Sequence, residues 1–316
     1  MAILSLYCMN TILFGNGFNM LSPNCPSWDI LLSKISSDSY STIIKGIPPT
    51  FQYEQIFLKS IPISDEIELK KEVIKQLQDI QFNNFYRRLQ LLKADVYLTT
   101  NYDHVFYNNS KSLIDFNDVE KIYSIRRWKR IKINDLTTSL YFIHGDIDAP
   151  KSIMLGFDHY AGAIAKIENY VKGDYSVGKS QKIPSIEKRI KNGLIKVNPK
   201  EYGFKDSKSG ILSWIDTFFF SNIHIIGLSL DLAEIDIWWL LNRRARLMKN
   251  GKLDNKIYYY PTFPLSEIHV HLPKLRLLEK LNVKIIHHQQ FVDIISGQND
   301  YDSIYNEQLD NLRKYL

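Results

Sequence analysis

The chain has 316 residues, of which 45% are hydrophobic and 23% are charged, and this composition is typical of a globular protein with a sizeable core. A net charge of +6 does not by itself indicate a nucleic-acid-binding protein, and two cysteines exclude a disulfide framework or a four-cysteine zinc site. The sparse cysteine usage predicts a cytoplasmic location, and no apolar run is long enough to predict a membrane span.

Short apolar runs that end at glycine or polar residues recur along the chain. They predict strands buried on both faces of a parallel sheet, at 11–14, 95–98, 140–143, 224–226, 256–260 and 283–286. Between them, apolar residues recur at helical spacing, at 27–34, 64–92, 161–170, 185–192, 209–220, 232–249, 272–281 and 301–316. This alternation predicts an α/β fold with a doubly wound, Rossmann-like and mainly parallel sheet.

We expect one domain spanning residues 1–316. The segments between some of the strands are longer than simple crossovers, which predicts a helical insertion lobe that covers the cleft. The expected parts are a Rossmann core at about 8–20, 94–160 and 221–290, a helical lobe at about 27–93 and 161–220, and a C-terminal helix at 301–316.

Four polar motifs directly follow predicted strands, at the edge of the sheet where ligands bind in such folds. They are Gly15-Asn16-Gly17-Phe18-Asn19, Thr99-Thr100-Asn101-Tyr102-Asp103, Ile143-His144-Gly145-Asp146 and Gly227-Leu228-Ser229-Leu230. A glycine turn lets the backbone approach a phosphate, amide and carboxylate groups can hold a ribose, a carboxamide or a water, and a histidine can act as a base near neutral pH.

Each motif also has an ordinary structural interpretation. The glycines fit a simple turn, Asn101 fits a helix cap, and a single histidine is usually structural. Glu234 and Asp236, which follow the fourth motif, fit the preference for acidic residues at the start of a helix. The shared position of the four motifs therefore carries more weight than any one of them.

Other polar residues are weaker candidates. Two basic clusters, at 126–130 and 243–246, are interpreted as solvated charged faces or as surfaces for an anionic ligand or nucleic acid. Asp158 and His159 are minor candidates for the cleft wall. The pairs His269 with His271 and His287 with His288 have no evident third ligand, so no metal site is predicted.

Together, and in this order, the four motifs resemble those of the sirtuin family. Sirtuins carry a Gly-Ala-Gly turn, a Thr-Gln-Asn-Ile-Asp segment, a His-Gly pair and a Gly-Thr-Ser-Leu segment. Two features differ from deacetylating sirtuins: Cys8 and Cys25 cannot form their zinc module, and the longer gap between Asn101 and His144 leaves room for a strand at 121–127. Both features are similar to the sirtuin-like NADase domains of bacterial antiphage defence systems. The AbiH-like proteins, near neighbours, share a similar Gly-Asn-Gly-Phe opening.

The resemblance implies a site that binds NAD as its substrate and needs no metal. Asn101 and His144 would be catalytic, with Asn101 orienting the ribose or a water and His144 acting as the base. Gly15, Gly17 and Ser229 would hold the pyrophosphate, and Asp103 would contact the nicotinamide carboxamide. The other expected binding residues are Asn16, Phe18, Asn19, Thr100, Gly227 and Leu230.

The function implied by the resemblance is that of an NAD glycohydrolase, which cleaves NAD to nicotinamide and ADP-ribose. It would deplete NAD in the cytoplasm during antiphage defence (abortive infection). The implied partners are further copies of this chain in a homo-oligomer, and a HerA-type ATPase or a phage-derived trigger. No membrane is expected, and nucleic acid is not required. An NAD-dependent protein deacylase and an NAD- or ADP-ribose-binding sensor remain open as alternatives.

Overall fold

The computed structural model describes residues 9–36, 46–59, 66–107, 112–116, 121–133, 136–177, 181–193, 211–251, 253–289 and 301–316. Within them, eight strands form one sheet in the order β3-β4-β5-β2-β1-β6-β7-β8. The strands are β1 (Met9–Phe14), β2 (Val96–Thr99), β3 (Ser112–Phe116), β4 (Trp128–Ile133), β5 (Leu136–Phe142), β6 (Ser221–Ile226), β7 (Ile257–Tyr260) and β8 (Val283–Ile285).

The pairing of these strands confirms the predicted doubly wound α/β fold. From β5 through β2, β1, β6 and β7 to β8, all neighbouring strands are parallel. Only β4 runs the other way, because it pairs antiparallel with both β3 and β5. The chain leaves β1 for β2 on one side and later returns to place β6 on the other. The carboxyl ends of β1 and β6 therefore flank the topological switch point, where ligands bind in such sheets.

The six predicted strands are all present, but the predicted strand at 121–127 is wrong. Residues Lys121–Tyr123 form a short 3-10 helix, and the next strand, β4, begins only at Trp128. The ring of Tyr123 lies against Gly162, so close that a methyl group at this glycine would overlap with the ring. This contact with a distant helix holds the segment in a turn, and no local pattern predicts it.

Ten helices surround the sheet in the described part of the chain. They are α1 (Trp28–Ile35), α2 (Pro49–Lys59), α3 (Glu66–Leu77), α4 (Asn84–Leu91), α5 (Phe157–Lys172), α6 (Ile186–Lys191), α7 (Thr217–Phe220), α8 (Ile235–Lys249), α9 (Ile268–Lys280) and α10 (Tyr301–Tyr315). The predicted helix at 64–92 is in fact two helices, because the Asn83 side chain accepts a hydrogen bond from the Tyr86 amide and caps the start of α4. None of the helices described is long and apolar enough to cross a membrane.

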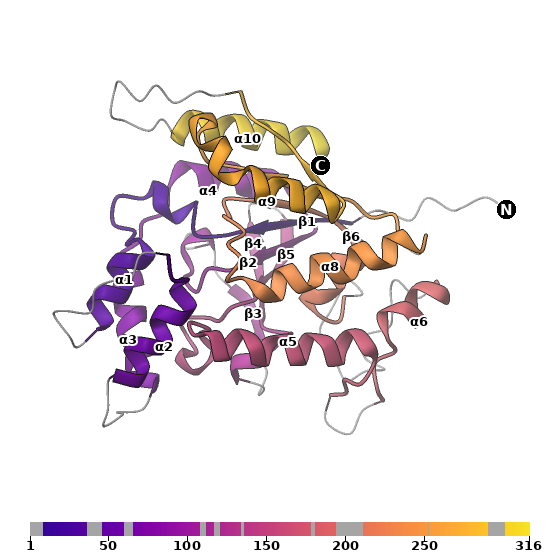
Figure 1. The fold of residues 1–316 in the computed structure, drawn as a ribbon, viewed down its shortest axis with the longest axis horizontal. Helices are drawn as coiled ribbons and strands as arrows, with labels where there is room; N and C mark the ends of the chain where they lie inside the picture. Colours follow the sequence, from indigo (N-terminus) through magenta and orange to yellow (C-terminus); the bar gives the residue numbers. More distant parts are fainter. Residues whose placement is uncertain are drawn as a thin grey trace.

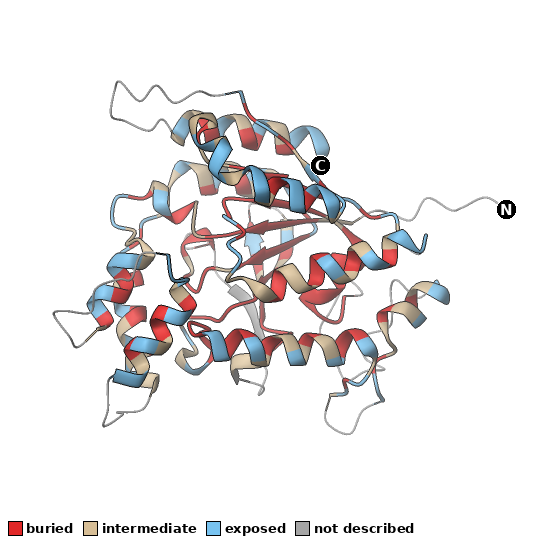
Figure 2. Ribbon diagram, viewed as in Figure 1, coloured by how far each residue is buried: buried red, intermediate tan, exposed pale blue. Residues whose placement is uncertain are grey.

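Alternate residues of the strands supply two hydrophobic clusters, one on each face of the sheet. On β1, Leu13 belongs to one cluster with residues of α5, α7, α8 and α9, whereas Ile12 and Phe14 belong to the other with residues of α4 and α10. Figure 2 shows that the strands between these helices are buried along most of their length. Burial on both faces explains why the strands are continuous apolar runs in the sequence.

Helices α1, α2 and α3 lie together at one end of the sheet, beyond the carboxyl ends of the parallel strands (Figure 1). They come from the first part of the expected helical lobe. From the second part, α5 packs along α8 and contributes Ile167, Tyr170 and Val171 to the core of the sheet. Helices α1 to α3 of the first part therefore lie over the switch point, while α4 and α5 cover faces of the sheet.

Candidate functional site

A cavity of about 490 Å³ lies at the switch point, and this volume is in the range of small-molecule sites. Its floor is formed by the loops that follow β1, β2, β5 and β6. Helices α1, α2 and α3 close it from above with residues that include Trp28, Thr50 and Leu77. The predicted site residues that line the cavity are Asn16, Gly17, Thr100, Asn101, Asp103, His144, Gly227 and Ser229.

The remaining predicted residues lie behind the cavity wall. Phe18, Asn19 and Leu230 are fully buried, and Leu230 adopts a left-handed backbone conformation at the turn that follows Ser229. Gly15 lies between the two neighbouring loops, where a methyl group would approach Leu228 Cδ1 to 2.6 Å and Thr100 Oγ1 to 3.0 Å. These four residues therefore shape the loops without facing the cavity themselves.

Gly17 is required by the close approach of the first and fourth motifs. Its amide donates a hydrogen bond of 2.9 Å to the Gly227 carbonyl. A methyl group at Gly17 would lie 2.7 Å from that carbonyl oxygen and would overlap with the hydroxyl of Tyr305. The glycine expected to admit a phosphate thus also has a structural task, because it lets the two loops touch.

The first and second motifs are joined by a buried hydrogen-bond network. Asn101 Nδ2 donates to Tyr86 Oη (3.1 Å), and Tyr86 Oη donates to Asn19 Oδ1 (2.6 Å). Asn19 Nδ2 donates in turn to Asp103 Oδ2 (2.7 Å) and to Asn16 Oδ1 (3.0 Å). Asn19 therefore orients Asp103 from behind. The part played by Tyr86 was not predicted, because its position on α4 has the pattern of an ordinary core residue.

Asn101 is 6% exposed, and its Oδ1 atom has no hydrogen-bond partner among the described residues. A buried acceptor without a donor is costly, by about 1–3 kcal/mol. A helix cap would use this oxygen to accept a backbone N–H, so the cap interpretation does not account for it. Next to it, burial raises the pKa of Asp103 above its ordinary value, although Val105 N and Asn19 donate to the carboxylate.

His144 is held by groups on both of its ring nitrogens. Its Nε2 lies 3.0 Å from Asp236 Oδ2 on α8, and its Nδ1 lies 3.4 Å from Tyr160 Oη on α5. An ionised carboxylate only accepts, so Nε2 carries the proton that bonds to Asp236, and the lone pair of Nδ1 can accept from the Tyr160 hydroxyl. Burial lowers the pKa of His144, but the charge and hydrogen bond of Asp236 outweigh burial and the net shift is upward.

The two acidic residues after the fourth motif face the site. Glu234 occupies the N-cap position of α8, but its side chain makes no capping hydrogen bond. It lines the cavity, and its Oε2 atom is buried without a partner in the described part of the chain. Burial raises the pKa of Glu234 to about 8, and the neighbouring carboxylate of Asp236 adds to this effect, while His144 opposes it.

A cationic group also reaches the cavity. Lys274 of α9 lines it, and its Nζ donates a hydrogen bond of 2.6 Å to the Ser229 carbonyl. Burial lowers the pKa of Lys274, and the carboxylates of Asp231 and Glu234 partly offset this effect. An ammonium group beside the fourth motif suits an anionic ligand group such as a phosphate. Lys274 lies more than 40 residues from that motif, so no local signal pointed to it.

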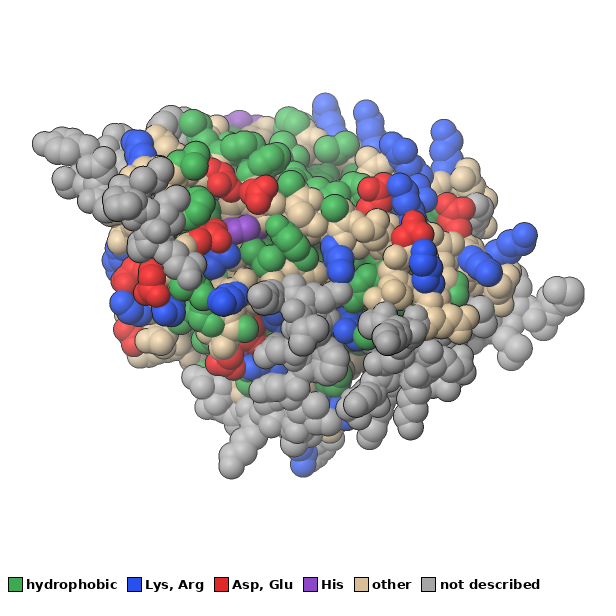
Figure 3. Space-filling view, turned by 90° about the horizontal axis from the view of Figure 1, so that it is seen from below, with side chains coloured by type: hydrophobic (Ala, Val, Ile, Leu, Met, Phe, Trp, Pro, Cys, Tyr) green, Lys and Arg blue, Asp and Glu red, His purple; other side chains and the backbone are tan. Residues whose placement is uncertain are grey.

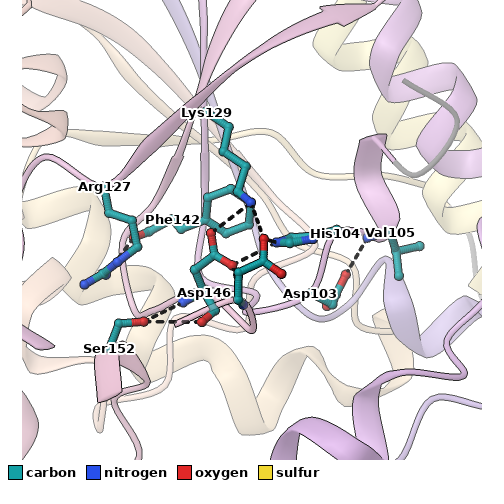
Figure 4. A network of polar contacts seen from close by, with 9 residues as sticks. Asp103, His104, Val105, Arg127, Lys129, Phe142, Asp146 and Ser152 are labelled. Atoms are coloured by element: carbon teal, nitrogen blue, oxygen red, sulfur yellow. Dashed lines mark hydrogen bonds and ion pairs between the residues drawn. The ribbon is translucent and has the colours of Figure 1, made fainter. Parts of the chain in front are cut away.

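A second polar cluster ties the loops after β2 and β5 together (Figure 4). His104 Nε2 lies 2.8 Å from Asp146 Oδ1, and Lys129 Nζ lies 2.7 Å from Asp148 Oδ2 and 3.4 Å from Asp146 Oδ2. The histidine and the two aspartates are close enough to hold a metal ion. Lys129 points into the same space and supplies the compensating positive charge there, so the arrangement fits an ion-pair cluster rather than a metal site.

The interpretation of the two basic clusters as charged surfaces is wrong for most of their residues. Arg126, Arg127 and Lys129 are 5%, 3% and 2% exposed, because the segment enters the sheet as β4, and Arg244 is fully buried. Arg244 instead donates to Asn255 and to the Asn282 carbonyl. On the face seen from below the view of Figure 1, basic and acidic side chains lie among hydrophobic ones (Figure 3).

The other candidate histidines have different roles, because they lie in different parts of the fold. His159 Nδ1 accepts the backbone N–H groups of Leu155 and Gly156 and so caps the start of α5. His271 lines the cavity and stacks on Phe263, with 4.0 Å between ring centroids, whereas His269 Nδ1 lies 3.1 Å from the Ser266 carbonyl oxygen. The structure therefore does not bring His269 and His271 together as a metal pair.

In comparison with known proteins, the chain matches no family model and no curated protein sequence. The resemblance to sirtuin-like domains therefore rests on the four motifs and on the α/β fold that carries them.

Proposed function

We propose that this chain is an NAD glycohydrolase that cleaves NAD to nicotinamide and ADP-ribose. The observation that carries this proposal is the meeting of Asn101, Asp103 and His144 in one cavity at the switch point, 490 Å³ in volume and bordered by the glycine loops. Apolar walls and a few convergent polar groups are typical of sites for small ligands of this kind.

The charges around the cavity support the same chemistry. In NAD cleavage the bond between nicotinamide and ribose breaks, nicotinamide leaves as a neutral molecule, and positive charge develops on the ribose. Fixed negative charge stabilises such a transition state most strongly where water is excluded. Asp103 lines the cavity and is 6% exposed, whereas Lys274 lies beside Ser229, where a pyrophosphate would bind.

The proton released when water adds to the ribose needs an acceptor. His144 Nδ1 is suited to this role because Nε2 is already committed to Asp236. Tyr160 Oη is the present neighbour of Nδ1, so a substrate hydroxyl or a water would replace it or reach His144 through it. Asn101 would orient that group through its unpaired Oδ1.

The direct test incubates the purified protein with NAD alone and measures nicotinamide. We expect release by the wild type and a loss of at least about 100-fold in Asn101→Ala and His144→Ala, in line with the usual size of general-base effects. His287→Ala, which removes an exposed histidine, is the control. Release that requires an added acylated peptide would instead identify a deacylase.

We also propose that NAD depletion by this activity serves antiphage defence, in a homo-oligomer and with a HerA-type ATPase or a phage-derived trigger as partner. Uncontrolled NAD cleavage would kill the host cell, so the activity must be gated. The test measures NAD in infected cells that express the wild type or His144→Ala. Protection by a chain that never lowers NAD would favour the sensor alternative.

A further inference from the structure

Two buried acceptor atoms in the cavity have no donor among the described residues. They are Asn101 Oδ1 and Glu234 Oε2, and both side chains line the cavity. Native proteins leave few such atoms unpaired, because each costs about 1–3 kcal/mol. A bound group that supplies hydrogen-bond donors at this place would remove that cost.

A capping hydrogen bond does not explain the position of Glu234. A glutamate at a helix start normally stabilises the first turn through a capping hydrogen bond or through the helix dipole. Here the side chain makes no capping bond, and its Oε2 atom is buried. Glu234 and His144 lie close enough for each to shift the pKa of the other, so Glu234 belongs to the end of the cavity that holds the proposed base.

We infer that Glu234 is a substrate-binding carboxylate that accepts a hydrogen bond from a hydroxyl of the ribose to which nicotinamide is attached. This inference rests on the proposed function. A ribose offers two adjacent hydroxyl groups, each of which can donate to the unpaired Oε2 atom. Asn101 Oδ1 accepts from the same sugar. Lys274, at the Ser229 side of the cavity, then faces the phosphates.

This arrangement also gives Glu234 a part in the chemical step. Hydrogen bonds to a sugar hydroxyl next to the reacting carbon strengthen as positive charge develops on the ring. A hydrogen bond from that hydroxyl to an ionised Glu234 would strengthen in the same way. The carboxylate would also stabilise the positive charge on the ring directly. No covalent bond to the carboxylate is involved.

The experiment measures the binding of ADP-ribose and of ADP, which lacks the second ribose, by calorimetry at pH 9, above the pKa of about 8 of Glu234. The variants are Glu234→Gln, which keeps the shape of the side chain, and Glu168→Gln, which removes an exposed carboxylate of α5 outside the cavity wall. For Glu234→Gln we expect affinity for ADP-ribose to fall about 10- to 100-fold, the size of a hydrogen bond to a charged group. Affinity for ADP should change little, and Glu168→Gln should bind both ligands like the wild type.

The melting temperature separates this role from a structural one. Because Glu234 is a buried acceptor without a partner, Glu234→Gln should melt no lower than the wild type, whereas loss of a helix-start interaction would lower the melting temperature. An equal loss of affinity for ADP and ADP-ribose, or no loss at all, overturns the inference while the proposed function stands. A wild-type protein that neither binds ADP-ribose nor cleaves NAD overturns both.

Discussion

The His144–Asp236 pair offers the sharpest test of the electrostatics of the site. Replacing Asp236 by asparagine keeps the size of the side chain but removes the charge 3.0 Å from His144 Nε2. In the wild type, burial lowers the pKa of His144 and Asp236 raises it by more, so the net shift is upward. In Asp236→Asn, burial still lowers the pKa of His144. Glu234 still raises this pKa, but the Tyr160 phenol does not, because it stays neutral.

The expected size of the change comes from a second histidine in the same molecule. His224 on β6 is buried without a carboxylate partner, and burial alone lowers its pKa from 6.5 to about 4. An opposite charge in hydrogen-bond contact is worth about 1–3 pKa units. We therefore expect the pKa of His144 to fall in Asp236→Asn from above its ordinary value to below it, towards that of His224.

The pKa of His144 can be followed by NMR through its ring protons, assigned by their loss in His144→Ala. The acid limb of the pH profile for NAD cleavage should move to lower pH by the same amount. The pair should also stabilise the folded protein below pH 6.5, and this contribution should disappear as the pH rises through the raised pKa. An unchanged or higher pKa of His144 in Asp236→Asn would refute this account of the site.

Three further substitutions test other parts of the structure by urea denaturation. Burial raises the pKa of Glu234 from 4.5 to about 8, so the folded protein keeps a proton that the unfolded chain loses, and its free energy of unfolding should fall between these pH values. Glu234→Gln should lack this fall, and parallel pH profiles would contradict the assignment. Gly17→Ala places a methyl group 2.7 Å from the Gly227 carbonyl and should cost about 1–3 kcal/mol; an unchanged midpoint would show that the loops can separate freely. Asp216→Asn breaks the buried bidentate pair with Arg189 and should cost about 3–5 kcal/mol, and a loss below 1 kcal/mol would mean that the pair is dispensable.

The sequence was sufficient for the parts of the fold that local periodicity determines. The parallel strands are buried on both faces, so β1, β2, β6 and β7 are apolar runs that end at polar residues, and the helices between them carry helical spacing. The strands β3 and β4 were not predicted. In β4 basic side chains such as Lys129 are buried by tertiary contacts, and these interrupt the apolar pattern that identifies a strand.

For the site, the sequence determined which strand ends carry polar motifs, and the parallel sheet brings Asn101 and His144 to one cavity because the carboxyl ends of its strands share one edge. The tertiary structure alone decided the partners of these residues. Tyr86, Tyr160 and Lys274 lie on helices outside the motifs, 15, 16 and 45 residues from their partners, and nothing in their local patterns separates them from core or surface residues. The same holds for Glu234 and Asp236. Acidic residues are common both at the start of a helix and in the wall of a site, so the sequence does not distinguish the two roles. Only the tertiary structure places Asp236 against His144 and Glu234 in the cavity wall.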